Sequence, residues 1–176
     1  MSKSIDKILK KDKYMDCIRD LIDHEKVQEM NNYIQHGNTT TLDHCIRVSY
    51  TSYKISKLFK MDYKSTARAA LLHDLYLYDW HKNDEKTSFF KKHGFTHASK
   101  ALENANKYFK LNRKEKDIIK KHMWPLTLRS VPRYKESFVV SMVDKYKSTG
   151  ETLVPYTSKI AKACIFFINI FVNLVK

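Results

Sequence analysis

The stretch 67-ARAALLHDLYLYDWHK-82 places a histidine and an aspartate inside a hydrophobic run. Small and apolar residues precede His73 and Asp74, and the apolar pattern resumes at Leu75. A helix capped by Asp62 is expected to run through residues 63–80. A carboxylate without a partner on the apolar side of a helix costs folding free energy, so natural chains pair it or give it a metal ion. The partner of Asp74 therefore becomes the main question that this sequence raises.

Composition favours a soluble domain built from helices. The chain has 176 residues, of which 43% are hydrophobic and only 3 are glycine and 3 proline. Its mean hydropathy is -0.54, which excludes a polytopic membrane protein. So few helix breakers favour long helices over a many-stranded sheet. We expect an all-α fold in one domain, residues 1–176, with no internal repeat and no linker.

The charge is strongly basic, with 33 Lys and Arg against 19 Asp and Glu, for a formal net charge of +14. Such a surface attracts phosphates. The alternative is a compositional bias, because lysine is accompanied by abundant asparagine, isoleucine and tyrosine, as in an AT-rich genome. No arginine-rich run and no basic patch with interleaved aromatic residues is present, so no specific nucleic-acid binding is predicted.

Cysteine usage and the chain ends indicate a cytoplasmic protein. Cys17, Cys45 and Cys164 form no CxxC pair and are odd in number, so no disulfide framework is expected. The first residues lack the apolar stretch of a signal peptide. Residues 164–175, CIFFINIFVNLV, are nearly all apolar, but a bilayer span needs about 20 residues. We expect a C-terminal helix over 156–176 packed into the core; the alternative is a peripheral membrane anchor or a self-association face.

Hydrophobic periodicity divides the rest of the chain into helices. The expected helices cover Tyr14–Gln35 before Gly37, the threonines after Asn38 to Phe59, residues 63–80, His97–Phe109, the segment from Arg113 to Trp124, and a segment from Tyr134 to Ser148 closed by Gly150. Asn112 and Glu115 resemble a capping box. Pro125 and Pro132 delimit a loop.

Polar residues of metal-ligand type stand beside hydrophobic stripes on several of these helices. They are His44, His73, Asp74, His97, His122 and Asp144. A single histidine on an apolar face is more often a hydrogen-bonded core residue than a ligand, and one His-Asp pair is weak evidence. Side chains from facing helices can nevertheless converge in a bundle core to form a metal site.

Taken in order, these residues resemble the pattern H…HD…H…H…D of the HD-domain superfamily of metal-dependent phosphohydrolases. The resemblance covers residues 40–148 and implies an all-α bundle of about six to eight helices. It implies that His44, His73, Asp74 and Asp144 hold one metal ion, and that Asp74 bridges to a second ion held by His97 and His122. In the segment KKHGFTHASKAL, the family pattern fits His97 better than His93, because Ala101 provides the small residue four positions later.

The resemblance also implies a chemistry. Imidazole and carboxylate ligands suit Fe, Mn, Zn, Co or Ni, and two such ions can activate a water and clamp a phosphate. The expected reaction is hydrolysis of a phosphoester or phosphoanhydride. The predicted catalytic residues are Asp74, His93 and Lys145, and His81 and Arg133 are further candidates to assist the leaving group. Cys45 is not expected to act as a nucleophile, because its neighbour His44 is committed to metal.

The substrate is expected to be a phosphorylated small molecule, and specifically a nucleotide or dinucleoside polyphosphate. Family members that cleave cyclic dinucleotides usually follow the His-Asp pair with a Gly-Lys step, which this chain lacks. Tyr76, Tyr78 and Trp80 either line a base-binding cleft or belong to the core. The alternative function is that of a non-catalytic HD domain, which binds a nucleotide or a protein partner through its basic surface and apolar C-terminus.

Overall fold

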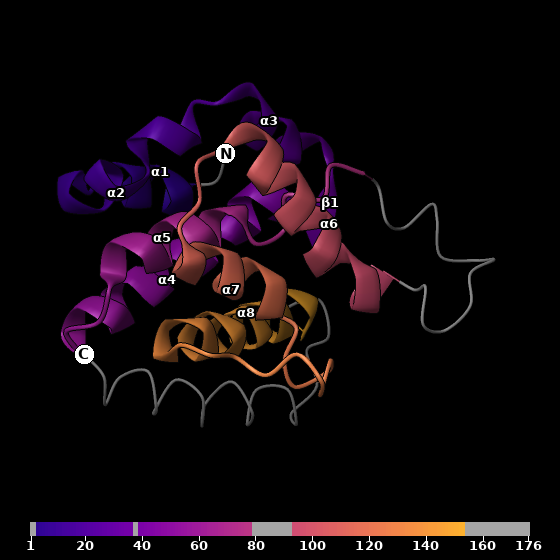
Figure 1. Ribbon diagram of the computed structural model, residues 1–176. Coiled ribbons are helices and arrows are strands. Elements are labelled where there is room, and N and C mark those ends of the chain that lie inside the picture. Colours follow the sequence, from indigo (N-terminus) through magenta and orange to yellow (C-terminus); the bar gives the residue numbers. More distant parts are fainter. Residues whose placement is uncertain (1–2, 37–38, 79–92, 154–176) are drawn as a thin grey trace.

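Helices make up nearly all the regular structure of residues 3–36, 39–78 and 93–153, which the computed structural model describes (Figure 1). The helices are α1 (Lys3–Leu9), α2 (Asp12–Ile22), α3 (Glu25–Gln28), the 3-10 helix η1 (Glu29–Asn32), α4 (Thr41–Leu58), α5 (Tyr63–Leu72), α6 (His93–Tyr108), α7 (Arg113–Lys121) and α8 (Lys135–Leu153). Two short strands, β1 (Ile34–His36) and β2 (Thr39–Thr40), form an antiparallel pair. The predicted all-α fold is confirmed.

Helices α4 and α5 form the centre of the bundle. In Figure 1 they lie between the N-terminal helices, in indigo, and α7 and α8, in orange. Helix α4 contacts α5, α8 and α1, while α7 contacts α5, α6 and α8. Ala67, Ala69 and Ala70 of α5 are completely buried, and their small side chains allow close helix packing. The buried Ser49 of α4 donates a hydrogen bond to the carbonyl of Ala67 at 2.7 Å, which ties the two helices together.

The helix starts follow the capping residues that the sequence predicts. The side chain of Asp62 accepts a hydrogen bond from the backbone N–H of Ser65 at 3.0 Å, at the start of α5. Asn112 and Glu115 form the complete capping box of α7, with both hydrogen bonds at 2.8 Å. Thr40 caps α4 in the same way. Each cap satisfies a backbone donor that the first helical turn leaves without an intrahelical partner.

The expected helix over Tyr14–Gln35 is wrong beyond Ile22. The ring of His24 accepts a hydrogen bond from the backbone N–H of Lys26 at 3.1 Å and begins the separate helix α3. The chain then becomes extended at Tyr33, so that β1 can pair with β2. A local cap and a strand pairing therefore override the helical periodicity of this segment.

Four other helix boundaries differ from the expected ones. Helix α5 ends at Leu72, so the prediction that it continues through residues 73–80 is wrong for the described part of that range. Helix α7 ends at Lys121, before Trp124, and α6 already begins at His93. Helix α8 continues through Gly150 to Leu153. Asp74 thus lies just after a helix end and not on the apolar face of a helix.

Several sequence-based expectations concern residues outside the described ranges. These are the C-terminal helix over 156–176, Trp80, His81 and Cys164. Within the described residues, no helix is both long and apolar enough to cross a membrane. Cys17 and Cys45 are buried free thiols, as expected from the spacing of the cysteines.

Candidate metal centre

The six predicted metal ligands come together in one buried cluster at the middle of the bundle. None of the six residues is more than 6% exposed. The cluster contains His44 from α4, His73 and Asp74 from the end of α5, His97 from α6, His122 from the end of α7, and Asp144 from α8. Five helices therefore contribute to a single site, as the convergence of helices in a bundle allows.

Asp74 occupies the middle of this cluster. Its Oδ1 atom lies 3.3 Å from Nε2 of His97 and 3.4 Å from Nε2 of His122. Its Oδ2 atom lies 3.3 Å from Nε2 of His73. The two carboxylate oxygens thus face different histidines, so this one side chain connects the two halves of the cluster.

Within each half of the cluster, the donor atoms are close enough together to bind one metal ion. One half contains His44, His73 and Asp144, and the other contains Asp74, His97 and His122; in each, the donor atoms lie within 4.8 Å of one another. In the first half, Oδ1 of Asp144 lies 3.1 Å from Nε2 of His44 and 3.6 Å from Nε2 of His73. In the second, the Nε2 atoms of His97 and His122 are 2.8 Å apart.

Helix ends orient two of the histidines. His73 and His122 each follow the last residue of a helix, and each Nδ1 lies near the carbonyl oxygen three residues earlier, at 2.7 Å from Ala70 and 2.8 Å from Ile119. These carbonyls have no helical partner, so the ring Nδ1–H groups donate to them. When these rings are neutral, each Nε2 atom therefore carries a lone pair that faces the cluster, which is the tautomer that a metal ion requires.

Cys45 lies near the same cluster. Its sulfur is 3.7 Å from Nδ1 of His73, and Cys45, His73 and Asp74 form a third group of neighbouring donors. Because Nδ1 of His73 is committed to the carbonyl of Ala70, the ring offers Nε2 and not Nδ1 to an ion. The thiol therefore faces the protonated side of His73.

Unsatisfied buried atoms in the cluster are a second indication, besides the distances between donor atoms, that its residues suit divalent metal ions. Nε2 of His73 and Oδ1 of Asp74 are buried and have no hydrogen-bond partner. A buried lone pair without a partner costs about 1 to 3 kcal/mol, and a cation placed between these atoms would satisfy both. The donors are imidazole nitrogens and carboxylate oxygens, the set that suits first-row transition metals.

The electrostatics of the cluster keep its carboxylates charged. Burial alone would raise the pKa of Asp74, but the neighbouring histidines, above all His73, hold that pKa well below its ordinary value. Burial lowers the pKa of His122 to about 4, with His73 and His97 acting in the same direction. At neutral pH, the cluster therefore presents a carboxylate and at least one neutral imidazole, as metal binding requires.

Protons compete with a metal for the other half of the cluster. Burial lowers the pKa of His44, but hydrogen bonds to Asp144 and Glu151 outweigh it and raise that pKa to about 10. The pKa of His73 is likewise raised well above its ordinary value by Asp74 in spite of burial. Binding of a cation at these rings would release their protons.

A hydrogen-bonded group that the sequence did not predict contacts Asp74 through Gln35, which in turn contacts Thr41 and Tyr76. The side-chain amide of Gln35 donates to Oδ2 of Asp74 at 2.6 Å. The amide oxygen of Gln35 accepts hydrogen bonds from the hydroxyls of Tyr76 and Thr41. Tyr76 is only 1% exposed, and burial raises its pKa. Of the two interpretations of Tyr76, the structure thus favours the core, where the phenol orients Gln35.

Glu151 also contacts the cluster and was missed. Its Oε2 atom lies 2.7 Å from Nδ1 of His44, and its Oε1 atom accepts a hydrogen bond from Arg47 at 3.2 Å. The sequence predicted that Gly150 closes the helix, so Glu151 was not considered. Its spacing of seven residues from Asp144, which is two helical turns, is the signal that could have identified it.

Three of the four residues predicted to assist the leaving group belong to the described ranges, and their surroundings differ. Nζ of Lys145 donates to Oδ2 of Asp144 at 3.0 Å and to the carbonyl of His122 at 2.6 Å, so this ammonium group lies at the edge of the cluster. The side chain of Arg133 is exposed, and its backbone N–H donates to Asp117. His93 is the first residue of α6, but its side chain lies outside the described part. The catalytic roles of Lys145 and His93 remain predictions.

Comparison with known families adds one result. The sequence model of the family described as "HD domain" matches residues 41–149, a range that contains all six ligands. No curated protein and no solved structure matches the chain.

Proposed function

Because this chain belongs to the HD domain family, which implies the superfamily of metal-dependent phosphohydrolases, we propose that it hydrolyses a phosphoester or phosphoanhydride bond at the buried histidine and aspartate cluster. The observation that carries this proposal is the position of Asp74, whose two oxygens face different sets of histidines. A bridging carboxylate of this kind is the element that a dinuclear site needs.

In this proposal His44, His73, Asp74 and Asp144 hold one divalent ion, and Asp74, His97 and His122 hold a second. When bound, such ions supply Lewis-acid stabilisation of a phosphate and lower the pKa of water. The chain itself fixes the ligands. The carbonyls of Ala70 and Ile119 set the orientation of two imidazoles, and Gln35 holds Oδ2 of Asp74.

Lys145 is proposed to provide positive charge where the phosphate binds. Its ammonium group lies 3.0 Å from Oδ2 of Asp144, and its side chain is 33% exposed, so it can also reach a ligand that enters from solvent. A negatively charged leaving group is stabilised by such a neighbour. His93, the first residue of the helix that carries His97, is proposed to act as a proton donor.

The proposed substrate is a nucleotide or a dinucleoside polyphosphate. The net charge of +14 favours a substrate with several phosphates. The half-buried ring of Tyr78, whose centroid is 5.0 Å from that of the buried Tyr76, offers an aromatic surface close to Asp74 in the chain. The absence of a Gly-Lys step after Asp74 disfavours a cyclic dinucleotide.

The test combines elemental analysis with a hydrolysis screen. We expect about two transition-metal ions per chain in protein purified without chelator, and a loss of at least one of them in His122→Ala. A matched control is His24→Ala, because the ring of His24 caps α3 and packs on Phe109 with centroids 4.7 Å apart. A single tightly held ion per wild-type chain, unchanged in His122→Ala, would contradict the dinuclear site.

The screen compares nucleoside triphosphates, dinucleoside polyphosphates, cyclic dinucleotides and simple phosphomonoesters with the metal-loaded protein. We expect metal-dependent release of phosphate or nucleotide from the first two classes. Preferential cleavage of cyclic dinucleotides would overturn the substrate assignment. Full metal occupancy without hydrolysis of any class would instead identify a non-catalytic HD domain.

A further inference from the structure

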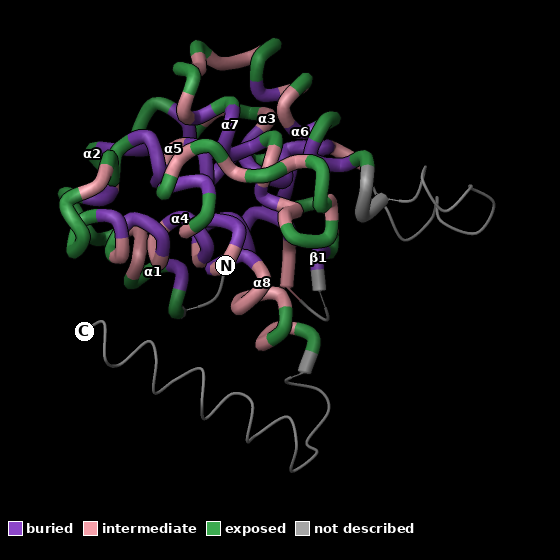
Figure 2. Tube along the Cα trace, turned by 60° about the horizontal axis from the view of Figure 1, so that its bottom comes forward, coloured by how far each residue is buried: buried purple, intermediate pink, exposed green. Residues whose placement is uncertain are grey.

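A pocket of about 540 Å³ lies where α1, α4 and α8 meet, and none of the predicted metal ligands lines it. Figure 2 shows these three helices on one side of the molecule. The lining residues are Ser4, Lys7, Ile8, Lys11, Arg47, Tyr50, Thr51, Lys54 and Lys147. The volume falls in the range of small-molecule sites, which is about 300 to 1,000 Å³.

The charged residues that line this pocket are positively charged. Five of its nine described lining residues are lysine or arginine, and none is a carboxylate. They come from separate parts of the chain, since Lys7 belongs to α1, Lys54 to α4 and Lys147 to α8. Such a concentration of like charge in a concave surface is unfavourable in itself and produces a strong positive potential.

The residues of α4 share one face of that helix. Arg47, Tyr50, Thr51 and Lys54 follow the spacing i, i+3, i+4, i+7, which places them on one side of the helix. Nζ of Lys54 lies 5.3 Å from the centroid of the Tyr50 ring. The face therefore offers two cations, a hydroxyl group and an aromatic surface to the same ligand.

Lys147 supports the same interpretation. Burial lowers its pKa, and Lys54 and Arg47 lower it further, whereas Glu151 acts in the opposite direction. Because the pKa remains below its ordinary value, Glu151 offsets the burial and the two neighbouring cations only in part. An anion in the pocket would add to this negative charge.

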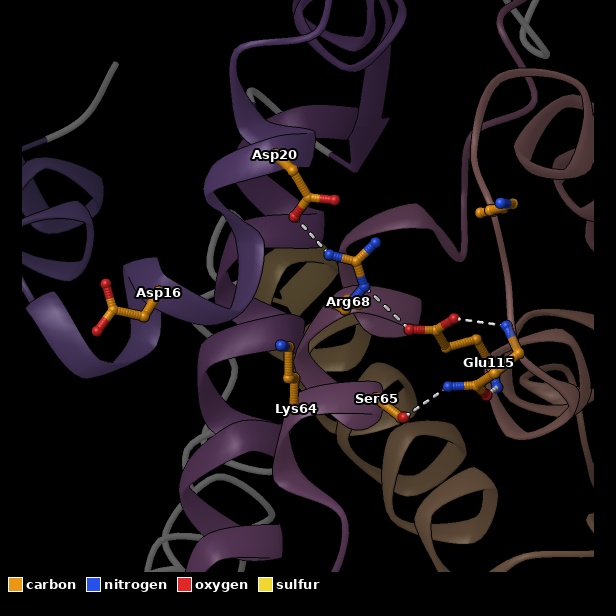
Figure 3. A pocket seen from close by; sticks show the side chains of 8 residues that line it. Asp16, Asp20, Lys64, Ser65, Arg68 and Glu115 are labelled. Atoms are coloured by element: carbon orange, nitrogen blue, oxygen red, sulfur yellow. Dashed lines mark hydrogen bonds and ion pairs between the residues drawn. The ribbon is translucent and has the colours of Figure 1, made fainter.

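A second cleft shows what a charge-balanced surface looks like in this protein. The cleft of about 390 Å³ between α2, α5 and α7 is lined by three acidic and three basic residues. As Figure 3 shows, Arg68 lies between Asp20 and Glu115, and it donates to Oε1 of Glu115 at 3.0 Å. Asp20 and Glu115 thus neutralise Arg68 within the protein, and acidic and basic lining residues are equal in number, so that cleft carries no ligand assignment.

We propose that the basic pocket binds a polyphosphate anion, either free or as part of a nucleotide, at a site separate from the metal centre. The cations of α1, α4 and α8 contact the phosphate oxygens, and the hydroxyl groups of Ser4 and Thr51 can donate further hydrogen bonds. Tyr50 and Ile8 provide the apolar wall against which a base could pack.

The test is isothermal titration calorimetry of the full chain with inorganic tripolyphosphate. We expect saturable binding that weakens with added salt. Lys54→Gln and Lys7→Gln should each weaken binding about tenfold, as expected for the loss of one charge-assisted hydrogen bond. Arg47 is left intact because it also contacts Glu151, a neighbour of His44.

The control is Lys57→Gln, one turn beyond Lys54 on α4, because Lys57 is exposed and its Nζ lies over the ring of Tyr53, outside the pocket. It should bind like the wild type. Equal weakening in Lys57→Gln and Lys54→Gln, or no saturable binding, would overturn the proposal, because the effect would then belong to the general surface charge.

Two further titrations complete the test. The affinity for tripolyphosphate should persist in Asp74→Ala, which removes the centre of the metal cluster, and its loss there would overturn a separate site. Titration with ATP distinguishes the two sources of the anion. Equal affinities support a site for the phosphates alone, and tighter binding of ATP that is lost in Tyr50→Ala supports a nucleotide.

Discussion

The carboxylate of Glu151 lies 2.7 Å from Nδ1 of His44, while that of Asp144 lies 3.1 Å from Nε2 of the same ring. Both carboxylates come from α8, two helical turns apart, and the ring comes from α4. A carboxylate that accepts the Nδ1–H group of a histidine fixes its tautomer and makes Nε2 a better metal ligand. Glu151 therefore acts on the cluster as a positioning residue.

The first prediction concerns this contact. Glu151→Gln keeps the shape of the side chain but removes its charge, so the affinity for metal should fall about tenfold. Competition with a chelating dye measures this affinity. The control is Arg47→Gln. In this variant Glu151 loses its 3.2 Å contact with Arg47 but keeps its contact with His44. An equal loss of affinity in both variants would show that the ion pair, and not the orientation of His44, is responsible.

The second prediction concerns Gly150. Since α8 continues to Leu153 and a Cβ atom added at Gly150 would meet no other atom within 4 Å, an alanine fits there without a clash. Gly150→Ala should raise the free energy of unfolding by about 0.5 to 1 kcal/mol, because glycine has the lower helix propensity. Thermal and urea denaturation measure the change. A lower stability would instead support the sequence-based expectation that Gly150 ends the helix.

Residue type and order predicted the metal cluster better than helix boundaries did. Histidine and aspartate beside apolar stripes are conspicuous in a sequence, and the structure brings all six together. The sequence could not show that His73 and His122 follow helix ends, because the hydrophobic pattern continues past both. The carbonyls of Ala70 and Ile119, which orient these rings, carry no sequence signal at all.

Long-range pairing explains the other differences. Gln35 contacts Asp74 only because β1 leaves the helical path and pairs with β2. That strand pair overrides the helical periodicity of the segment before it. In contrast, the caps at Asp62 and Asn112 were predictable, because their hydrogen bonds span only three residues.

The third prediction is a pH dependence of stability at Glu136, which is not one of the six cluster residues. Glu136 is buried, and its carboxylate accepts hydrogen bonds from Nζ of Lys114 at 2.9 Å and from the backbone N–H of Asp62 at 3.0 Å. Burial acts to raise the pKa of Glu136, but these partners outweigh it and lower the pKa below its ordinary value of 4.5. The charged form is therefore the one that the fold stabilises.

Glu136→Gln should consequently lower the free energy of unfolding by about 2 kcal/mol at pH 7. Because the folded pKa is depressed, this difference is present above pH 4.5 and disappears as the pH falls through the folded pKa of Glu136. Urea denaturation of both proteins between pH 7 and pH 3 measures it. Glu103→Gln is the control, since Glu103 is exposed and paired only with Lys100 at the surface among its described ion pairs. A difference that stays constant over this range would contradict the ion-pair explanation.

The last prediction compares two buried aspartates that have different partners. Asp74 faces His73, His97 and His122, and its Oδ1 atom has no hydrogen-bond partner. Asp117 is also buried, but its carboxylate is satisfied by Nζ of Lys121 at 2.9 Å and by the hydroxyl of Ser137 at 2.8 Å. The carboxylate of Asp74 is therefore arranged to bind a metal cation, whereas that of Asp117 is neutralised by Lys121 of the same chain.

Asp74→Ala should abolish metal binding and lower the rate of hydrolysis by several orders of magnitude, while cooperative helical melting is retained. Asp117→Ala should keep the metal and the activity per folded molecule but lose about 3 kcal/mol of stability, because Lys121 is left without its partner. Elemental analysis, turnover and melting temperature are measured on both variants and the wild type. If Asp74→Ala retained its metal and showed the collapse in melting temperature expected of Asp117→Ala, Asp74 would be a structural ion-pair residue. Lost metal with an intact fold would support its role as the carboxylate shared by both halves of the cluster.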